Sequence, residues 1–468
     1  MAPAPLRPPS RLLAPLATLA LAVPLALYIG RAPLSQPLLA AAAVLLFAAA
    51  FAHAEAGLVI LVASMLLSPE IPLGAAGAGG GLEASRNVIL RTEDLVLLLV
   101  GLGWLARMAI HKDLGAIRRS RLNTAIALYV ACCLGSTLLG IEGGRVKPVV
   151  GLCYVAKYVE YFFIFFMTLN HVRTPERLRR ILVALLATAA IIVVYAWWQV
   201  PRGIRPSAPF EGAQGEPNTL GGYLVLITAI ASALALHAPA LPWRRAAGVL
   251  ALLAVPPLVL TLSRSSWLGL LFAFAMLLAL SPRRGRLAAW AAAGAAVLFL
   301  LLPARVEDRL RYTFTPEGTD AVQVGRMHLD PSSSARLHSW ESALTGFERH
   351  PIFGWGVTGY GFLDAQYFRV LVEIGAVGML CFLALLLGCW RLFAALRREA
   401  ADPLHRALGL GLLAGFAGLC AHAVGTNTFL LIRIMEPFWM FTALAAAALE
   451  LERAAAEPVA TPSLRVAA

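Results

Sequence analysis

Long apolar segments recur along almost the whole chain and limit the folds that it can adopt. A helix needs roughly 17–25 mainly apolar residues to cross a bilayer, and it satisfies its own backbone polar groups there. Runs near this length occur at about 12–29, 37–53, 57–71, 92–110, 122–141, 148–169, 181–200, 219–238, 247–262, 266–281, 287–303, 364–390, 407–425 and 431–450. We therefore predict an all-α, polytopic helical membrane protein with about 12–14 transmembrane helices.

Composition excludes a soluble protein of this length. Hydrophobic residues make up 59% of the 468 positions and charged residues 14%, whereas a soluble domain must cover its outside with polar groups. The first apolar run is interpreted as a spanning helix and not as a cleaved signal. Six cysteines lie inside predicted helices without metal-ligand spacing and are interpreted as small apolar filler: Cys132, Cys133, Cys153, Cys381, Cys389 and Cys420.

Basic residues gather in alternate loops, and this pattern predicts the orientation of the chain. They are His111, Lys112, Arg118, Arg119, Arg121, Arg173, Arg177, Arg179, Arg180, Arg244, Arg245, Arg283, Arg284, Arg286, Arg391, Arg397, Arg398 and Arg406. The positive-inside rule places these loops and both termini in the cytoplasm. The net charge of +13 then reflects topology and not a nucleic-acid surface. Loop counting places residues 302–361, 202–218 and 263–266 on the outer face.

Four regions follow from this count. N-terminal transmembrane helices occupy 1–301, a large outer loop 302–363, C-terminal transmembrane helices 364–450, and a disordered cytoplasmic tail 451–468. The loop is expected to contain short helices. One of them is amphipathic, with a cap at Ser332, Ser333 or Ser334, an apolar stripe of Leu337, Trp340, Leu344 and Phe347, and an end at Pro351 and the glycines beyond it.

Arginines collect on the predicted outer face, which suits a diphosphate-bearing lipid because a guanidinium binds phosphate oxygens through two donors. They are Arg202, Arg205, Arg264, Arg336, Arg369 and Arg433. Lipid headgroups are the alternative partners. Arg264 lies in a short polar turn, and the alternative there is a side chain that snorkels from a helix end. Arg336 lies in the first turn of the amphipathic helix, against the helix dipole, so we expect an anion to hold it.

Three charged pairs have helical spacing. Arg369 and Glu373 are four residues apart, with Gln366 one turn earlier, and Arg433 and Glu436 are three apart. Both pairs are predicted to bind substrate near the outer face, with a purely structural salt bridge as the alternative. A third pair, Lys157 with Glu160, lies deeper and is interpreted as structural. No nucleotide-binding, phosphate-loop or metal-ligand motif is present in the sequence, so we expect no cofactor and no metal.

Four segments together carry a family resemblance. They are GAQGEPNTLGGYL, which contains Asn218, TLSRSSWLGL around Arg264, SSSARLHSWESALTGFERHPIFGWGVTGYG around Arg336, and DAQYFRVLVEIGAVG, which ends in Gly375 and Gly378. In this order the chain resembles the O-antigen ligase and polymerase superfamily of integral membrane glycosyltransferases over about 150–450.

The resemblance implies an enzyme of the bacterial inner membrane that acts on the periplasmic face. The donor would be a glycan on undecaprenyl diphosphate, and the acceptor another saccharide or the lipid A core. Neither a metal nor a nucleotide sugar would be needed. By position, Arg264 and Arg336 correspond to the arginines that hold the donor diphosphate, in agreement with the argument from charge. Membrane lipids are the other expected partners, and no nucleic acid is expected.

One position departs from the family. Where the ligases place a histidine followed by Asn, Ser or Gln, this chain has Asp364 and Ala365. Asp364 could accept the proton of the acceptor hydroxyl, or it could cap the next helix. His338 and His350 are nearby substitutes. The missing histidine favours a polymerase of exopolysaccharide or O-antigen repeat units over an O-antigen ligase. The remaining alternative, a polysaccharide lipid transporter or flippase, would place charges along a path near the midplane, where only Lys157 and Glu160 fit.

Overall fold

The structure is a computed structural model that describes residues 35–68, 70–71, 90–110, 118–211, 215–301, 323–324, 327–328, 331–361 and 363–456. Its α-helices are α2 (Ser35–Ala52), α3 (Ala54–Leu67), α4 (Thr92–Ile110), α5 (Asn123–Glu142), α6 (Pro148–His171), α7 (Pro175–Gln199), α8 (Pro217–His237), α9 (Leu241–Leu260), α10 (Arg264–Leu280), α11 (Arg284–Leu301), α13 (Pro331–Arg349), α14 (Gln366–Glu399), α15 (Pro403–His422) and α16 (Ile432–Ala456). A 3-10 turn, η2, covers Val200–Arg202.

Outside the helices, the described residues contain two short pairs of β-strands. Strand β1 (Glu70–Ile71) pairs with β2 (Leu90–Arg91), and β3 (Gln323–Val324) pairs with β4 (Met327–His328), both antiparallel. Among the described residues, eight helices are long and apolar enough to cross a membrane, and α3, α10 and part of α2 are shorter apolar helices. The predicted all-α, polytopic membrane fold is therefore confirmed. Each predicted apolar run from 37–53 onward coincides with a helix, and the run at 12–29 lies outside the described residues.

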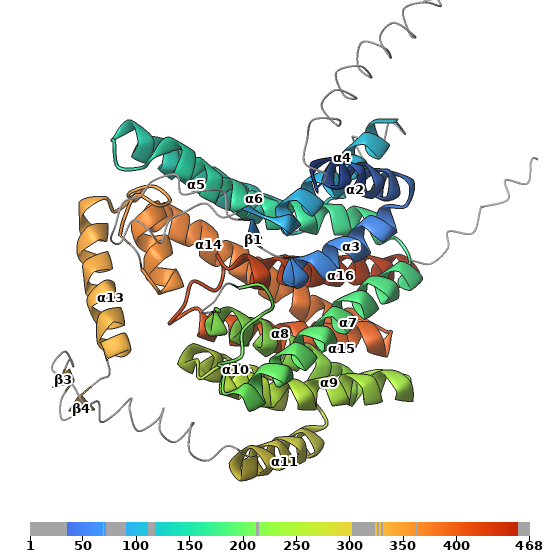
Figure 1. The fold of residues 1–468 in the computed structure, drawn as a ribbon. Helices are drawn as coiled ribbons and strands as arrows, with labels where there is room; N and C mark the ends of the chain where they lie inside the picture. Colours follow the sequence, from blue (N-terminus) through green and yellow to red (C-terminus); the bar gives the residue numbers. More distant parts are fainter. Residues whose placement is uncertain are drawn as a thin grey trace, which may run out of the picture.

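The helices lie side by side, and α13 runs across one end of the bundle (Figure 1). Helices α8, α15 and α16 form its centre, because their apolar windows are almost wholly buried, whereas α5, α6, α7 and α9 keep more than half of theirs exposed. Exposed apolar side chains on the outer helices include Leu138, Val194, Leu252 and Leu380. A lipid-facing surface of this kind is what a membrane protein requires, since hydrocarbon is the solvent there.

Small residues bring the central helices into close contact. On α15, a Cβ at Gly411 would lie 2.7 Å from the Cα of Ile230, and one at Gly418 would lie 2.6 Å from Val225 on α8 and 2.7 Å from the carbonyl oxygen of Gly269 on α10. Membrane helices associate through such close packing, because lipid tails give no hydrophobic force between helices.

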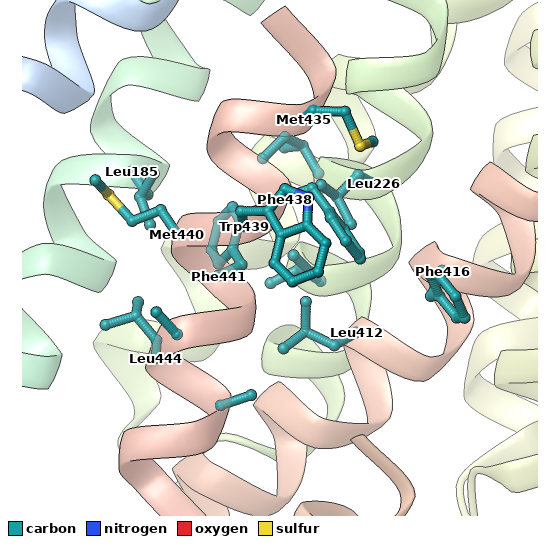
Figure 2. Packing of buried hydrophobic residues seen from close by; sticks show 14 of the residues in the cluster. Leu185, Leu226, Leu412, Phe416, Met435, Phe438, Trp439, Met440, Phe441 and Leu444 are labelled. Carbon is teal, nitrogen blue, oxygen red and sulfur yellow. The ribbon is translucent and has the colours of Figure 1, made fainter. Parts of the chain in front are cut away.

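Aromatic side chains fill the space beside this contact (Figure 2). Phe438 stacks on Phe416 with ring centroids 5.7 Å apart, and Trp439 meets Phe162 of α6 edge-on at 4.7 Å. Rings in offset or edge-to-face contact add dispersion and quadrupole attraction to close packing. Helix α16 is thereby fixed against α6 and α15 at once.

Ion pairs gather at the end of the bundle opposite α13. Arg118 pairs with Glu450, Arg180 with Glu55 at 2.8 Å, Arg179 with Asp402 at 3.6 Å, and Arg453 with Glu399 at 2.7 Å. Two of these pairs join the loop before α5 and the end of α14 to the C-terminal end of α16, and the other two join the start of α7 to α3 and to the loop before α15. The basic residues at 118, 179 and 180, which the sequence assigns to one side, therefore share one end of the structure.

Helix α14 is broken at Gly375, which has φ 70° and ψ −171°. A Cβ at this position would overlap the carbonyl oxygen of Ile352, so only glycine fits both the conformation and the contact. The segment after α13 runs beside the break: Trp355 N donates to the carbonyl of Val372 at 3.0 Å, and Ala376 N donates to that of Pro351 at 2.8 Å. These hydrogen bonds at the break hold residues 350–361, which we call the outer segment, against the bundle.

Two details differ from the sequence predictions. On α13, Leu344 is 47% exposed and Ala343 packs inward in its place. Helix α16 continues to Ala456, so residues 451–456 of the expected disordered tail are helical, and 457–468 lie outside the described residues. The six cysteines are free, as expected of filler, although the sulfurs of Cys132 and Cys381 lie 3.3 Å apart between α5 and α14.

Candidate functional site

The turn between α9 and α10 presents Arg264. Ser263 caps α10, and its Oγ accepts hydrogen bonds from the N–H of Ser266 at 3.3 Å and from the Ser266 hydroxyl at 2.9 Å. Arg205, from the loop after η2, donates Nε and Nη2 to the carbonyl of Thr261 at 3.0 and 2.7 Å. Arg264 is therefore the first residue of a helix whose start is fixed by polar contacts, and its side chain is only partly exposed.

Arg336 of α13 forms an ion pair with Asp364. Nη2 of Arg336 lies 3.7 Å from Oδ2 of Asp364, and the side chains are 21% and 35% exposed. The sequence predicted that an anion holds Arg336 against the helix dipole, and the carboxylate of Asp364 is that anion. The pair joins the outer segment to the residues that lead into α14.

The structure excludes the alternative in which Asp364 caps the next helix. Helix α14 begins at Gln366, its cap position is Ala365, and no side chain caps it. The turn between α15 and α16 holds this segment instead, since Gln366 N donates to the carbonyl of Ala423 at 3.1 Å and Asn427 Nδ2 donates to that of Leu363 at 2.7 Å. The position of Asp364 is thus set by the C-terminal helices.

Gly425 marks the point where the arginine-bearing segments meet. A Cβ built there would lie 2.5 Å from Oγ of Ser265 and 3.9 Å from Cζ of Arg336. Ser265 directly follows Arg264 in α10. The guanidinium of Arg336 therefore lies near Ser265, so the Arg336–Asp364 pair stands close to the start of α10, of which Arg264 is the first residue. We call the cluster of Arg264, Arg336 and Asp364 the arginine site.

His422 lies beneath this site and was missed in the sequence. It is fully buried at the end of α15, and its Nδ1 lies 2.7 Å from Oγ1 of Thr428 and 2.9 Å from Oγ1 of Thr426. Its Nε2 has no hydrogen-bond partner among the described residues, although the backbone of Asn218 lies near enough to act on the ring. Asn218 itself is partly exposed in the first turn of α8. The sequence signal that could have indicated it is a histidine at the end of an apolar run, shortly before the polar segment GTNT.

The Arg369–Glu373 pair is present but buried. Nε of Arg369 lies 3.2 Å from Oε1 of Glu373, and the side chains are 11% and 4% exposed. Oε1 of Glu373 accepts a hydrogen bond from the N–H of Thr358 at 3.2 Å, and its carbonyl accepts one from the hydroxyl of Ser136 at 2.8 Å. The pair therefore holds the outer segment against α5 and α14. This arrangement favours the structural salt bridge over the predicted substrate-binding role.

Trp355 and Tyr360 pack this segment onto α13. Nε1 of Trp355 donates to the carbonyl of Gly346 at 2.8 Å, and the hydroxyl of Tyr360 donates to that of Ser342 at 2.6 Å. A Cβ at Gly346 would lie 2.6 Å from the Tyr360 ring, so the absence of a side chain lets the ring close. A hollow of about 400 Å³ beside them is lined by His338, Glu341, Ser342, Thr345, Gly346, Arg349 and Tyr360.

The expected pair of Arg433 and Glu436 is wrong. Arg433 is 1% exposed and donates to the carbonyls of Pro209 at 2.6 Å and Ser68 at 3.2 Å, with Oε1 of Glu211 3.6 Å away. Neither carboxylate oxygen of Glu436 has a hydrogen-bond partner among the described residues. The spacing permits a pair, but the loop of residues 203–211 supplies enough acceptors to draw the guanidinium away.

The remaining candidates make contacts with residues outside the arginine site. Arg202 is exposed, with its guanidinium 3.7 Å above the ring of Trp198. His338 is exposed and faces Glu341 at 3.9 Å. His350 packs edge-on against Trp355, with ring centroids 4.6 Å apart. Neither histidine forms part of the Arg336–Asp364 pair.

Burial raises the pKa of two carboxyl groups at this end of the bundle. It raises the pKa of Asp364 above its ordinary value, while the neighbouring charge of Arg336 opposes the rise. It also raises the pKa of Glu211 to about 7, against the attraction of Arg433. The site thus combines permanent positive charge with a carboxylate that binds a proton more readily than usual. Among the described residues, no group of three or more His, Cys, Asp or Glu side chains is placed to hold a metal ion.

Comparison with known families locates a match over this region. Residues 249–383 match a family model, Wzy_C, which is described as O-antigen ligase. The matched segment begins in α9 and ends in α14, so it contains the arginine site and the Arg369–Glu373 pair. It does not include Arg433 or His422. A search of curated proteins gave no match.

Proposed function

We propose that this chain, a member of the O-antigen ligase and polymerase superfamily, transfers a glycan from a polyprenyl diphosphate to the hydroxyl of an acceptor sugar and so polymerises repeat units. The family supports a glycosyltransferase-type ligase or polymerase activity in general. The observation that supports the specific reaction is the Arg336–Asp364 pair, 3.7 Å long, at the start of α10. A guanidinium, which can bind phosphate, lies there beside a carboxylate, which can accept a proton.

Arg264 and Arg336 bind the donor diphosphate in this mechanism. As the bond between the anomeric carbon and the diphosphate oxygen breaks, negative charge grows on that oxygen. Guanidinium groups fixed at a partly buried site stabilise this charge without reorganisation. This role needs no metal. Arg205 supports it indirectly, by holding the turn in which Arg264 lies.

Asp364 accepts the proton of the acceptor hydroxyl. The hydroxyl oxygen attacks the anomeric carbon from the side opposite the diphosphate, so one C–O bond forms as the other breaks and the configuration inverts. The proton passes to a carboxylate oxygen of Asp364. Because a bound diphosphate engages Arg336, it weakens the ion pair and makes Asp364 a stronger base once the donor is in place.

The periplasmic face of the inner membrane is the proposed side of the reaction. The arginine site lies at the end of the bundle opposite the basic loops, and the positive-inside rule assigns those loops to the cytoplasm. Labelling of Ser342→Cys, on exposed α13, with a membrane-impermeant thiol reagent tests this. Whole cells should be labelled as strongly as open membranes. Protection in whole cells would contradict the orientation.

A polymerase is the first candidate because Asp364 stands where the ligases have histidine. A ligase is the second, since the matched family model is described as O-antigen ligase. Deletion of the gene, with complementation, separates the two when surface and lipid-linked glycans are analysed by gel and mass spectrometry. Single repeat units without long chains identify a polymerase. Full-length chains stranded on the lipid carrier identify a ligase, and unchanged glycans contradict both.

A further inference from the structure

A cluster of charged side chains lies inside the bundle where α3, α4, α6 and α16 meet, apart from the arginine site. Its centre is Glu436, which is 0% exposed and has no hydrogen-bond partner on either carboxylate oxygen among the described residues. The groups that act on it electrostatically are Glu93, Glu160, Lys157 and Asp94. Neither the proposed reaction nor the family match accounts for this cluster.

The neighbouring carboxylates already have partners. The hydroxyl of Ser68 donates to Oε2 of Glu93 at 2.6 Å, and Arg91 lies 3.6 Å from Oε1 of Glu93. Lys157 pairs with Asp94 and, at 2.9 Å, with Glu160.

Arg433, which precedes Glu436 by three residues in α16, is directed to Glu211 and to backbone carbonyls. The cations near Glu436 are therefore all paired with other carboxylates. The cluster contains more carboxyl groups than cations.

The other helices packed against α16 also carry charged or titratable side chains, and each of these has a partner other than Glu436. These are Arg369 with Glu373 on α14, His405 with Glu452 and His422 with two threonines on α15, His237 with Ser281 on α8, and Arg179 with Asp402 and Arg180 with Glu55 on α7. None of them is hydrogen-bonded to Glu436.

An ionised carboxylate in this position would destabilise the fold. The free energy of burying a charge without a partner is strongly unfavourable, whereas that of burying the neutral acid is much smaller. A metal ion is disfavoured as the ligand, because the described part of the chain has no suitably placed group of three metal ligands. We propose that Glu436 is a proton-binding site within the membrane, which carries an exchangeable proton at neutral pH. This inference does not depend on the proposed function.

Reaction with dicyclohexylcarbodiimide, an apolar carbodiimide, tests the site directly. The carboxyl proton passes to a carbodiimide nitrogen and the carboxylate oxygen bonds to the central carbon, so the reagent marks protonated acids in apolar surroundings. Purified full-length protein in detergent is treated at several pH values and its peptides are analysed by mass spectrometry. Glu341, which is 82% exposed on α13, serves as the internal control.

The expected result is labelling of Glu436 at pH 7, several-fold above Glu341, with a rate that falls when the pH is raised above neutral and does not respond to Na⁺. Failure to label Glu436 when its peptide is recovered, or labelling at pH 7 no faster than that of Glu341, would overturn the proposal. Protection by Na⁺ would assign the site to a metal cation instead and would also overturn it.

A substitution gives an independent test that does not use the reagent. Glu436→Gln reproduces the shape of the neutral acid, so the variant should fold with an unchanged yield and an unchanged thermal midpoint in detergent. Loss of the folded protein in this variant would show that the negative charge is needed, and would contradict a bound proton. Lys157→Gln is the comparison, because its removal takes from Asp94 and Glu160 the cation that they share and should lower the midpoint.

Discussion

Arg336 and Asp364 lie 3.7 Å apart, although α13 carries one and the segment before α14 carries the other. The contact closes the outer segment over the start of α10, where Arg264 lies. In the proposed reaction this guanidinium is shared between the carboxylate and the incoming diphosphate, which would link donor binding to the basicity of Asp364.

Asp364→Asn should lower the rate of glycan transfer about 10²–10⁴-fold, as expected for loss of a general base. In the wild type, the rate should fall as the pH drops through the pKa of Asp364, which burial raises above its ordinary value. This acid limb should be absent in the variant. The measurement is a pH–rate profile, with Glu341→Gln on the exposed face of α13 as the control. Full activity of Asp364→Asn would exclude Asp364 as the base.

Gly375→Ala should prevent the outer segment from docking on α14. The added Cβ would overlap the carbonyl oxygen of Ile352, and the position requires a φ of 70°, so we expect a destabilisation of about 3 kcal/mol or more. Yield and thermal midpoint in detergent measure the effect. Gly135→Ala on α5 is the matched control, since a Cβ there meets nothing within 4 Å. Equal stability of the two variants would contradict the broken helix.

Glu211 should give the protein a pH-dependent stability. Its folded-state pKa is raised to about 7 from 4.5, so the folded state binds its proton more tightly than the unfolded state. The contribution is fully present below about pH 4.5 and is lost as the pH rises through about 7, on the order of 3 kcal/mol in total. Thermal midpoints between pH 5 and 8 should therefore fall less in Glu211→Gln than in the wild type. Identical slopes would contradict the assignment.

Local patterns in the sequence predicted the helices and the pairs within them. Apolar runs of bilayer length leave the chain little choice but helix. Arg369 with Glu373 and Lys157 with Glu160 follow from spacing alone, because one helix brings both members together. In the polar loop, apolar residues spaced three or four apart and followed by a proline and glycines similarly predicted α13.

Contacts between distant segments could not be predicted in this way. Arg433 prefers Glu211, more than two hundred residues earlier, to Glu436 one turn away, because a loop folds over the end of α16 and offers carbonyls as well as a carboxylate. His422 is a second case. Its place beneath the arginine site depends on the packing of α8 against α15, which no local pattern reveals.

Transfer by the purified protein from a synthetic polyprenyl diphosphate-linked repeat unit tests the arginine site most directly. Arg336→Ala should lower the rate about 10²–10³-fold, as expected for loss of a fixed group that stabilises developing charge, and Arg336→Lys should recover only part of it. Arg349→Ala, at the other end of the same helix, is the control and should stay within about twofold of the wild type, a change of less than about 0.5 kcal/mol. Full activity of Arg336→Ala, or an equal loss in both alanine variants, would contradict the account.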